Sequence, residues 1–156
     1  MVRIGDMLRI SKLTDYSIVI LVFMAKDGNS LTSRQISEGS NIPLSTVSKV
    51  LKSLTRKDIL CSTRGATGGY TLAKIPKKTS VAEIVAAMEG PLAITECSDT
   101  EHATCSEEHT CPLKSHWNHI NLAVKSALRS VTLQDLLSPI PSYTVNAVTS
   151  PYTNIS

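Results

Sequence analysis

Apolar residues recur at helical spacing along most of the chain, which predicts a mainly α-helical fold. The first such stretch runs from Leu13 to Lys26, and Asp-Gly-Asn at positions 27–29 is typical of a helix C-terminus. This stretch is too short to cross a bilayer, and no signal-peptidase site follows it. We therefore expect a buried helix and no membrane partner.

Two further helices are predicted next, and the second has one polar face. Thr32 and Gln35 have the spacing of a capping box at the start of a short helix that ends near positions 39–41. The next helix is expected over residues 45–57, with its apolar periodicity continuing to Ile59 and Leu60. The polar face suits a major groove, with small groups for base edges and lysines for phosphates. Its members are Ser45, Thr46, Ser48, Lys49 and Lys52.

A glycine-rich turn at positions 64–69 lies between two short extended segments, residues 60–63 and 70–73. Helix, turn, helix and glycine-tipped hairpin, in this order, indicate a winged helix-turn-helix. A P-loop is not favoured, because the turn lacks the Gly-Lys-Ser/Thr ending. The hairpin tip is expected to approach the minor groove. Its candidate DNA-binding residues are Arg64, Gly65, Gly68 and Gly69.

The C-terminal part is predicted to hold a capped helix, a loop and a long helix. Ser80 and Glu83 form a second capping box, and Gly90-Pro91 ends that helix. A helix over residues 115–137 has little of its own domain left to cover it, so we expect it to pair with a second copy in a homodimer. The alternative is a helix folded back on its own domain. The predicted units are an N-terminal extension (1–7), a winged helix-turn-helix domain (8–91), a cysteine-rich loop (92–114), a dimerisation helix (115–137) and a disordered tail (138–156).

Charge is unevenly distributed along the chain. Between positions 45 and 78 the only acidic residue is Asp58. Between positions 92 and 116 the charged residues are acidic, with Lys114 as the exception. The basic residues of the first region are Lys49, Lys52, Arg56, Lys57, Arg64, Lys74, Lys77 and Lys78. This separation indicates one surface for a polyanion, which we take to be double-stranded DNA, and a second surface with another task.

Three of the four cysteines, Cys97, Cys105 and Cys111, lie in the acidic loop. Clustered cysteines in a protein of a reducing compartment, here the cytoplasm, indicate metal or redox chemistry more often than disulfides. Their spacing fits an iron–sulfur cluster and a zinc site equally, with a bare thiol sensor as a third possibility. Cys61 stands apart in an apolar-flanked strand, where we expect it to pack.

Several motifs in the right order resemble the Rrf2 family of bacterial regulators. They are Leu8 to Tyr16, Pro43 to Lys52 and Arg64 to Tyr70. Glu89-Gly90-Pro91 and Thr95-Glu96-Cys97 look closest to the branch that regulates Suf-operon genes for iron–sulfur cluster assembly. The resemblance covers about residues 7–137.

The resemblance implies a homodimeric winged-helix regulator with an iron–sulfur cluster on Cys97, Cys105 and Cys111, a [2Fe–2S] centre in preference to [4Fe–4S]. Some family members use a histidine soon after the third cysteine as the fourth ligand, and here His116 stands later than that place. Others use an acidic residue near the start of the first helix, a place that Asp15 matches. We therefore prefer Asp15, with His116 as the alternative.

These observations predict a transcription regulator, in the first instance a repressor, that senses cluster status and controls cluster-assembly genes. The alternative is a zinc-bound or thiol-based redox or stress sensor that also binds DNA. We do not expect an enzyme, because an open acidic loop raises a thiol's pKa and offers no fixed base.

Overall fold

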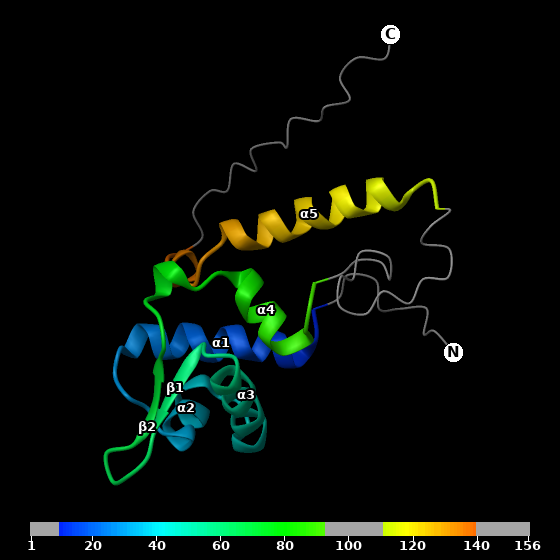
Figure 1. Cartoon of the computed structure of the whole chain (residues 1–156). Coiled ribbons are helices and arrows are strands. Elements are labelled where there is room, and N and C mark those ends of the chain that lie inside the picture. Colours follow the sequence, from blue (N-terminus) through cyan, green and yellow to red (C-terminus); the bar gives the residue numbers. More distant parts are fainter. Residues whose placement is uncertain (1–9, 93–110, 140–156) are drawn as a thin grey trace.

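The computed structural model describes residues 10–92 and 111–139, and it contains a small hairpin among helices (Figure 1). The elements in chain order are α1 (Lys12–Asp27), α2 (Ser33–Ser40), α3 (Leu44–Arg56), β1 (Leu60–Thr63), β2 (Gly69–Leu72), η1 (Pro76–Lys78), α4 (Val81–Glu89), α5 (Lys114–Ser130) and η3 (Asp135–Leu137). The predicted winged helix-turn-helix and the helix beyond the cysteine loop are therefore confirmed as elements.

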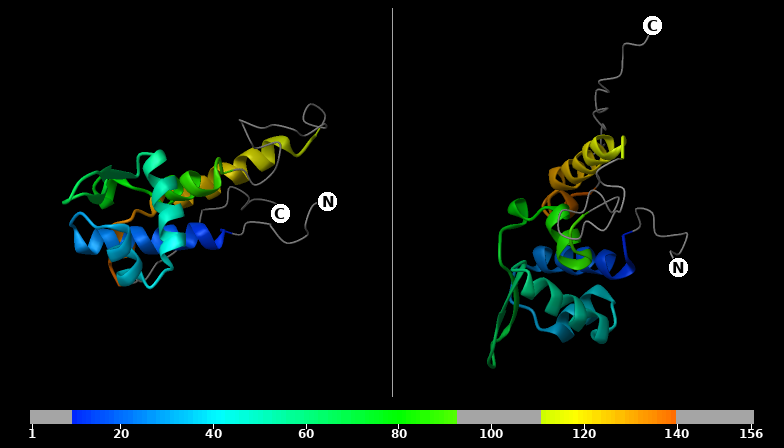
Figure 2. Two further views of the ribbon diagram at one scale, coloured as in Figure 1. Left: turned by 90° about the horizontal axis from the view of Figure 1, so that it is seen from below. Right: turned by 45° about the vertical axis from the view of Figure 1, so that its right-hand side comes forward.

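The helices stack in layers (Figures 1 and 2). α4 lies between α5 and α1, and α2 and α3 pack on the other side of α1. The hairpin projects past α2 and α3, at the end of the molecule away from α5. Apolar side chains from α1, α2, α3, α4, the hairpin and the segment after α5 form one core. Its fully buried members include Ile20, Leu21, Ile36, Val47, Val50, Leu51, Leu54, Ile84 and Leu133.

Local capping explains where the helices start and stop. α1 ends at Gly28, whose φ of 77° suits a glycine in the left-handed region. The amide of Gln35 donates to Thr32 Oγ1 (3.3 Å), and the amide of Thr32 donates to Gln35 Oε1 (2.9 Å). Ser80 and Glu83 make the same reciprocal pair at the start of α4. Both capping boxes predicted from the sequence are confirmed.

The end of α3 differs from the prediction. The helix stops at Arg56, and Asp58 adopts a positive φ of 55°, so the chain turns out of the helix there. Ile59 and Leu60 are therefore not helical, and Leu60 begins β1. Both are nevertheless buried, because the turn returns them to the core below α3.

α5 ends at Ser130, so the prediction of one helix to Leu137 is wrong over its last turns. Val131 is extended, and its carbonyl accepts from the amide of Val81 at 2.9 Å. Extended backbone suits a β-branched residue better than helix does. The chain after α5 thus returns to the start of α4 in its own domain.

A second set of bonds fixes this returning segment. The amide of Leu133 donates to the carbonyl of Thr79 (2.8 Å), and its side chain is fully buried. Thr132 and Asp135 bond to each other at the start of η3, with the amide of Thr132 donating to Asp135 Oδ2 at 2.8 Å. Residues 131–133 therefore pair with residues 79–81 of the same chain, and Leu133 is buried in the core of this domain.

Replacing Leu133 with Ala should lower the free energy of unfolding by about 2–5 kcal/mol, because the deletion leaves a cavity in a closed core. Leu122→Ala, on the outer surface of α5 and 61% exposed, is the matched control and should cost far less. Urea unfolding followed by circular dichroism measures both. A Leu133 variant as stable as the control would contradict the placement of this segment in the core.

Candidate nucleic-acid interface and cysteine segment

The outer face of α3 is exposed and basic. Ser45, Lys49, Lys52 and Arg56 are exposed and recur at spacings of four, three and four, so they lie along one side of the helix. The opposite side, with Val47, Val50, Leu51 and Leu54, is fully buried in the core. Burial of one face thus orients the other toward solvent.

Two other predicted DNA-binding residues of α3 are less available for contacts than the lysines. Thr46 is half-buried. Ser48 is exposed, but its hydroxyl donates to the carbonyl of Leu44 at 2.8 Å, which leaves its oxygen only as an acceptor. Direct contact of either residue with a base stays a prediction.

The hairpin places Arg64 at its exposed tip. β1 and β2 are antiparallel, with Thr63 opposite Gly69, and Gly65 in the turn has a φ of 113°. A Cβ on Gly68 would stand 2.3 Å from the carbonyl oxygen of Thr63, so the turn excludes any side chain there.

Gly69 is buried rather than presented at the tip. A Cβ there would stand 2.8 Å from the carbonyl oxygen of Leu31, whose backbone pairs with Tyr70. This glycine is therefore required by the packing of β2 on residues 30–31. A DNA contact by its backbone stays a prediction.

Cys61 is exposed, so the expectation that it packs inside is wrong. It follows Leu60 in β1, and side chains alternate between the two faces of a strand. Leu60 takes the buried face, which leaves Cys61 pointing outward opposite Thr71.

The candidate cluster ligands are only partly within the described structure. Cys97 and Cys105 lie outside it, whereas Cys111 is a free, partly exposed thiol just before α5. Asp15 is exposed in the first turn of α1, and His116 is exposed in the first turn of α5. In residues 10–92 and 111–139, no three Cys, His, Asp or Glu side chains come together as a metal site.

The ends of the cysteine segment (residues 92–112) are held by the helices. Asn121 of α5 is 5% exposed. With its amide oriented to satisfy its neighbours, it donates to the carbonyl of Leu92 at 3.3 Å and accepts from Lys125 Nζ at 3.3 Å. Cys111 adjoins the start of the same helix, since its carbonyl accepts from the amide of Lys114 at 3.4 Å. Leu92 and Cys111, near the two ends of the segment, are thus both bonded to α5.

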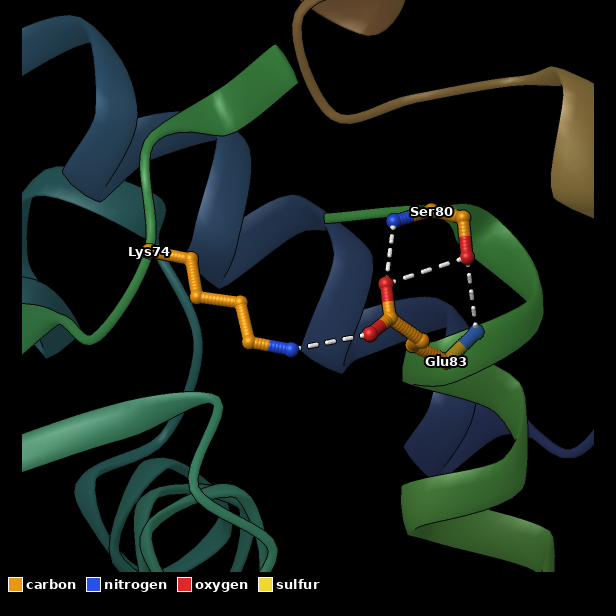
Figure 3. Close-up of polar contacts among 3 residues, drawn as sticks. All are labelled: Lys74, Ser80 and Glu83. Carbon is orange, nitrogen blue, oxygen red and sulfur yellow. Dashed lines mark hydrogen bonds and ion pairs between the residues drawn. The ribbon is translucent and has the colours of Figure 1, made fainter. Parts of the chain in front are cut away.

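The start of α4 is joined to the end of the hairpin (Figure 3). Lys74 Nζ lies 3.0 Å from Glu83 Oε1, and Glu83 Oε2 accepts from the amide of Ser80 at 2.8 Å. The hydrogen bond from the Ser80 amide, with that from Lys74, outweighs partial burial and lowers the pKa of Glu83. The carboxylate is therefore ionised in both bonds at neutral pH.

The other end of α4 is joined to α1 by hydrogen bonds that the sequence analysis did not predict. Glu89 Oε1 accepts from the amide of Ser11 at 2.9 Å and from the hydroxyl of Thr14. Partial burial raises the pKa of Glu89, but the hydrogen bonds from Ser11 and Thr14 outweigh it and the pKa is lowered. The partners are 75 and 78 positions apart, so no local motif predicts them.

Similarity to known proteins identifies the family. The family described as "Iron-dependent Transcriptional regulator", Rrf2, matches residues 10–139. The chain belongs to the Rrf2 family. This Rrf2 chain is 30% identical over 132 residues to the HTH-type transcriptional regulator NsrR of Bacillus subtilis, covering 83% of this chain and 90% of that protein. The chain is therefore a transcriptional regulator. The HTH-type regulators to which it is similar are not enzymes.

Solved structures with the same fold include two named Rrf2-type regulators. CymR (YrzC), the global cysteine regulator of B. subtilis, matches with a TM-score of 0.68 and 28% identity, covering 86% of this chain and all (100%) of that one. T. potens IscR matches with a TM-score of 0.62 and 23% identity over 83% of this chain and 86% of that one, which shows the fold alone. The winged-helix fold is confirmed, whereas the Suf branch stays a prediction. No helix in the described parts of this Rrf2 chain is long and apolar enough to span a bilayer.

Proposed function

We propose that this chain is a homodimeric DNA-binding regulator of the cytoplasm, in the first instance a repressor of iron–sulfur cluster-assembly genes, whose operator affinity depends on an iron–sulfur cluster. The exposed basic face of α3 carries the DNA-binding part of the proposal, and Arg64 at the exposed hairpin tip is its second element. Lys49, Lys52 and Arg64 contact phosphates, and Ser45, Thr46 and Ser48 read base edges. A dimer then binds half-sites about 34 Å apart or a small multiple of that distance.

The homodimer is supported by apolar side chains that α5 leaves uncovered. Trp117, Val124 and Leu128 are half-buried in their own chain, so this side of the predicted dimerisation helix is partly covered already. Leu113 and Ile120 are 53% and 44% exposed and lie two turns apart on one face. Ala123 and Ala127 continue that face at heptad spacing. A second copy of α5 is the occupant that we propose.

The cluster is supported by the donor set. Cys97, Cys105 and Cys111 supply three thiolates, which iron–sulfur clusters prefer, and the described member of the three is a free, accessible thiol. The fourth ligand is Asp15, with His116 as the alternative. When bound, the cluster, [2Fe–2S] in preference to [4Fe–4S], supplies a redox- and ligand-sensitive link among these residues.

A thiol-based or zinc-bound sensor is the second candidate. The likeness to CymR, which is described as a global cysteine regulator, favours it. In that case the three cysteines respond to oxidants or hold zinc, and no visible chromophore forms.

Purification without oxygen separates these candidates and tests the fourth ligand. The wild-type protein should be brown, with iron in proportion to protein. Asp15→Ala should change the visible circular dichroism, because an oxygen ligand is lost, whereas His116→Ala should keep the wild-type spectrum. Colourless protein holding zinc or no metal would overturn the cluster, and an altered spectrum in the His116 variant alone would make the histidine the ligand.

A further inference from the structure

Glu89 stands at a junction that the proposed function does not use. It is the last residue of α4, and only Gly90 and Pro91 separate it from the cysteine segment. Gly90 has a φ of 91°, which lets the chain leave the helix sharply. The first residues of the segment therefore follow directly on the end of α4.

The Glu89 carboxylate connects this end to the first turn of α1. Its Oε1 accepts from Ser11 and from Thr14, and the Thr14 side chain is fully buried. Ser11 is also the N-cap of α1, since its Oγ accepts from the amide of Thr14 at 3.2 Å. The amide of Asp15 donates to the carbonyl of Ser11 at 3.0 Å. One carboxylate thus fixes the turn that carries Asp15.

Both joined helices touch the recognition helix. α1 and α4 each pack against α3 as well as against one another. Packed helices move as bodies rather than deform, because interiors are close to maximal density. A shift at the junction of α4 and α1 therefore reaches α3.

We propose that Glu89 is a positioning residue that latches the start of the cysteine segment to the first turn of α1 and transmits the state of the segment to α3. The inference rests on the proposed function, since it assigns how the sensor site regulates DNA binding. The inference does not depend on whether Asp15 would be a ligand at the cysteine segment of its own chain or of the second copy. The latch fixes Asp15 to its own α4 in either case.

Four variants of the full-length protein test the latch. Glu89→Ala removes the acceptor, whereas Glu89→Gln keeps an oxygen for both bonds. Thr14→Val removes one donor with little change of shape. Glu83→Ala is the matched control, because it removes a glutamate of the same helix whose bonds lie at the opposite end.

Two quantities are measured for each variant. The first is hydrogen exchange of the Ser11 amide in cluster-free protein, which should be about tenfold faster in Glu89→Ala, as the loss of a hydrogen bond to a charged acceptor implies. The second is the ratio of affinities of loaded and cluster-free protein for one duplex selected from a random pool with the wild-type protein. This ratio should fall toward one in Glu89→Ala, fall partly in Thr14→Val, and stay near the wild-type value in Glu89→Gln and Glu83→Ala.

Wild-type exchange at Ser11 in Glu89→Ala would overturn the latch. Faster exchange with an unchanged affinity ratio would also overturn it, because the bond would then be structural only. If the wild-type protein takes up no cluster, the proposed sensor fails separately. The latch is then decided by exchange together with the affinity of the cluster-free variants for the same duplex, which should differ from wild type in Glu89→Ala and, to a smaller extent, in Thr14→Val.

Discussion

Changing any one of Cys97, Cys105 or Cys111 to Ala should abolish stable cluster incorporation, so that protein purified without oxygen is colourless and holds little iron. Each residue supplies one thiolate, and three thiolates with one weaker ligand leave no spare donor. Among the described residues, no three Cys, His, Asp or Glu side chains lie close enough together to hold a metal ion, so no alternative metal site includes Cys111. Iron assay and visible absorption measure the effect.

The fourth cysteine supplies the matched control. Cys61 is exposed on β1, so Cys61→Ala removes an accessible thiol without touching the segment. This variant should keep the wild-type spectrum and iron content. Wild-type iron in the Cys105 variant would contradict the assignment. Loss of iron in the Cys61 variant alone would place the centre at the hairpin instead.

The elements that were predicted correctly are those with local causes. The capping boxes at Thr32 and Ser80 each involve residues three apart, and Gly28 ends α1 through its own backbone freedom. The hairpin turn follows from Gly65, whose φ is positive, and from Gly68, where a Cβ would clash within the same turn. Such features are contained in a short window of sequence and need no knowledge of the rest of the fold.

The features that were missed depend on contacts between distant segments. Helical spacing continues to Val131, but pairing of residues 131–133 with residues 79–81 extends the chain there. Cys61 has apolar neighbours in sequence, yet strand alternation turns it outward. The hydrogen bonds of Glu89 with Ser11 and Thr14 join the two ends of the winged-helix domain. No sequence motif at either end predicts this contact.

Residue types and their pattern in the sequence predict only part of the candidate site. Exposed lysines on α3 and an arginine at a glycine turn follow from pattern and charge alone. The position of Asp15 relative to the cysteines does not, because it depends on how α1 and the segment meet. For that reason the resemblance, rather than spacing, suggested Asp15, and the choice between Asp15 and His116 needs the spectroscopic comparison.

The triple variant Lys49→Ala, Lys52→Ala, Arg64→Ala should weaken binding of the selected duplex by about a hundredfold or more at physiological salt. It should also reduce the slope of log affinity against log salt by about one unit for each phosphate contact removed. The reason is geometric. Two of the cations lie on the exposed side of α3 and the third at the exposed hairpin tip, at the end of the molecule away from α5.

Net charge alone would also weaken DNA binding, so the control removes the same charge elsewhere. Lys26, Lys77 and Lys78 are exposed at the end of α1 and on η1, away from the outer face of α3 and the hairpin tip. Their triple alanine variant loses three positive charges but no proposed contact, and its salt slope should stay near the wild-type value. Fluorescence anisotropy over a series of salt concentrations measures both variants. Equal slopes in the two variants would show that binding follows overall charge, and the assignment of α3 and the hairpin as the DNA-binding surface would be wrong.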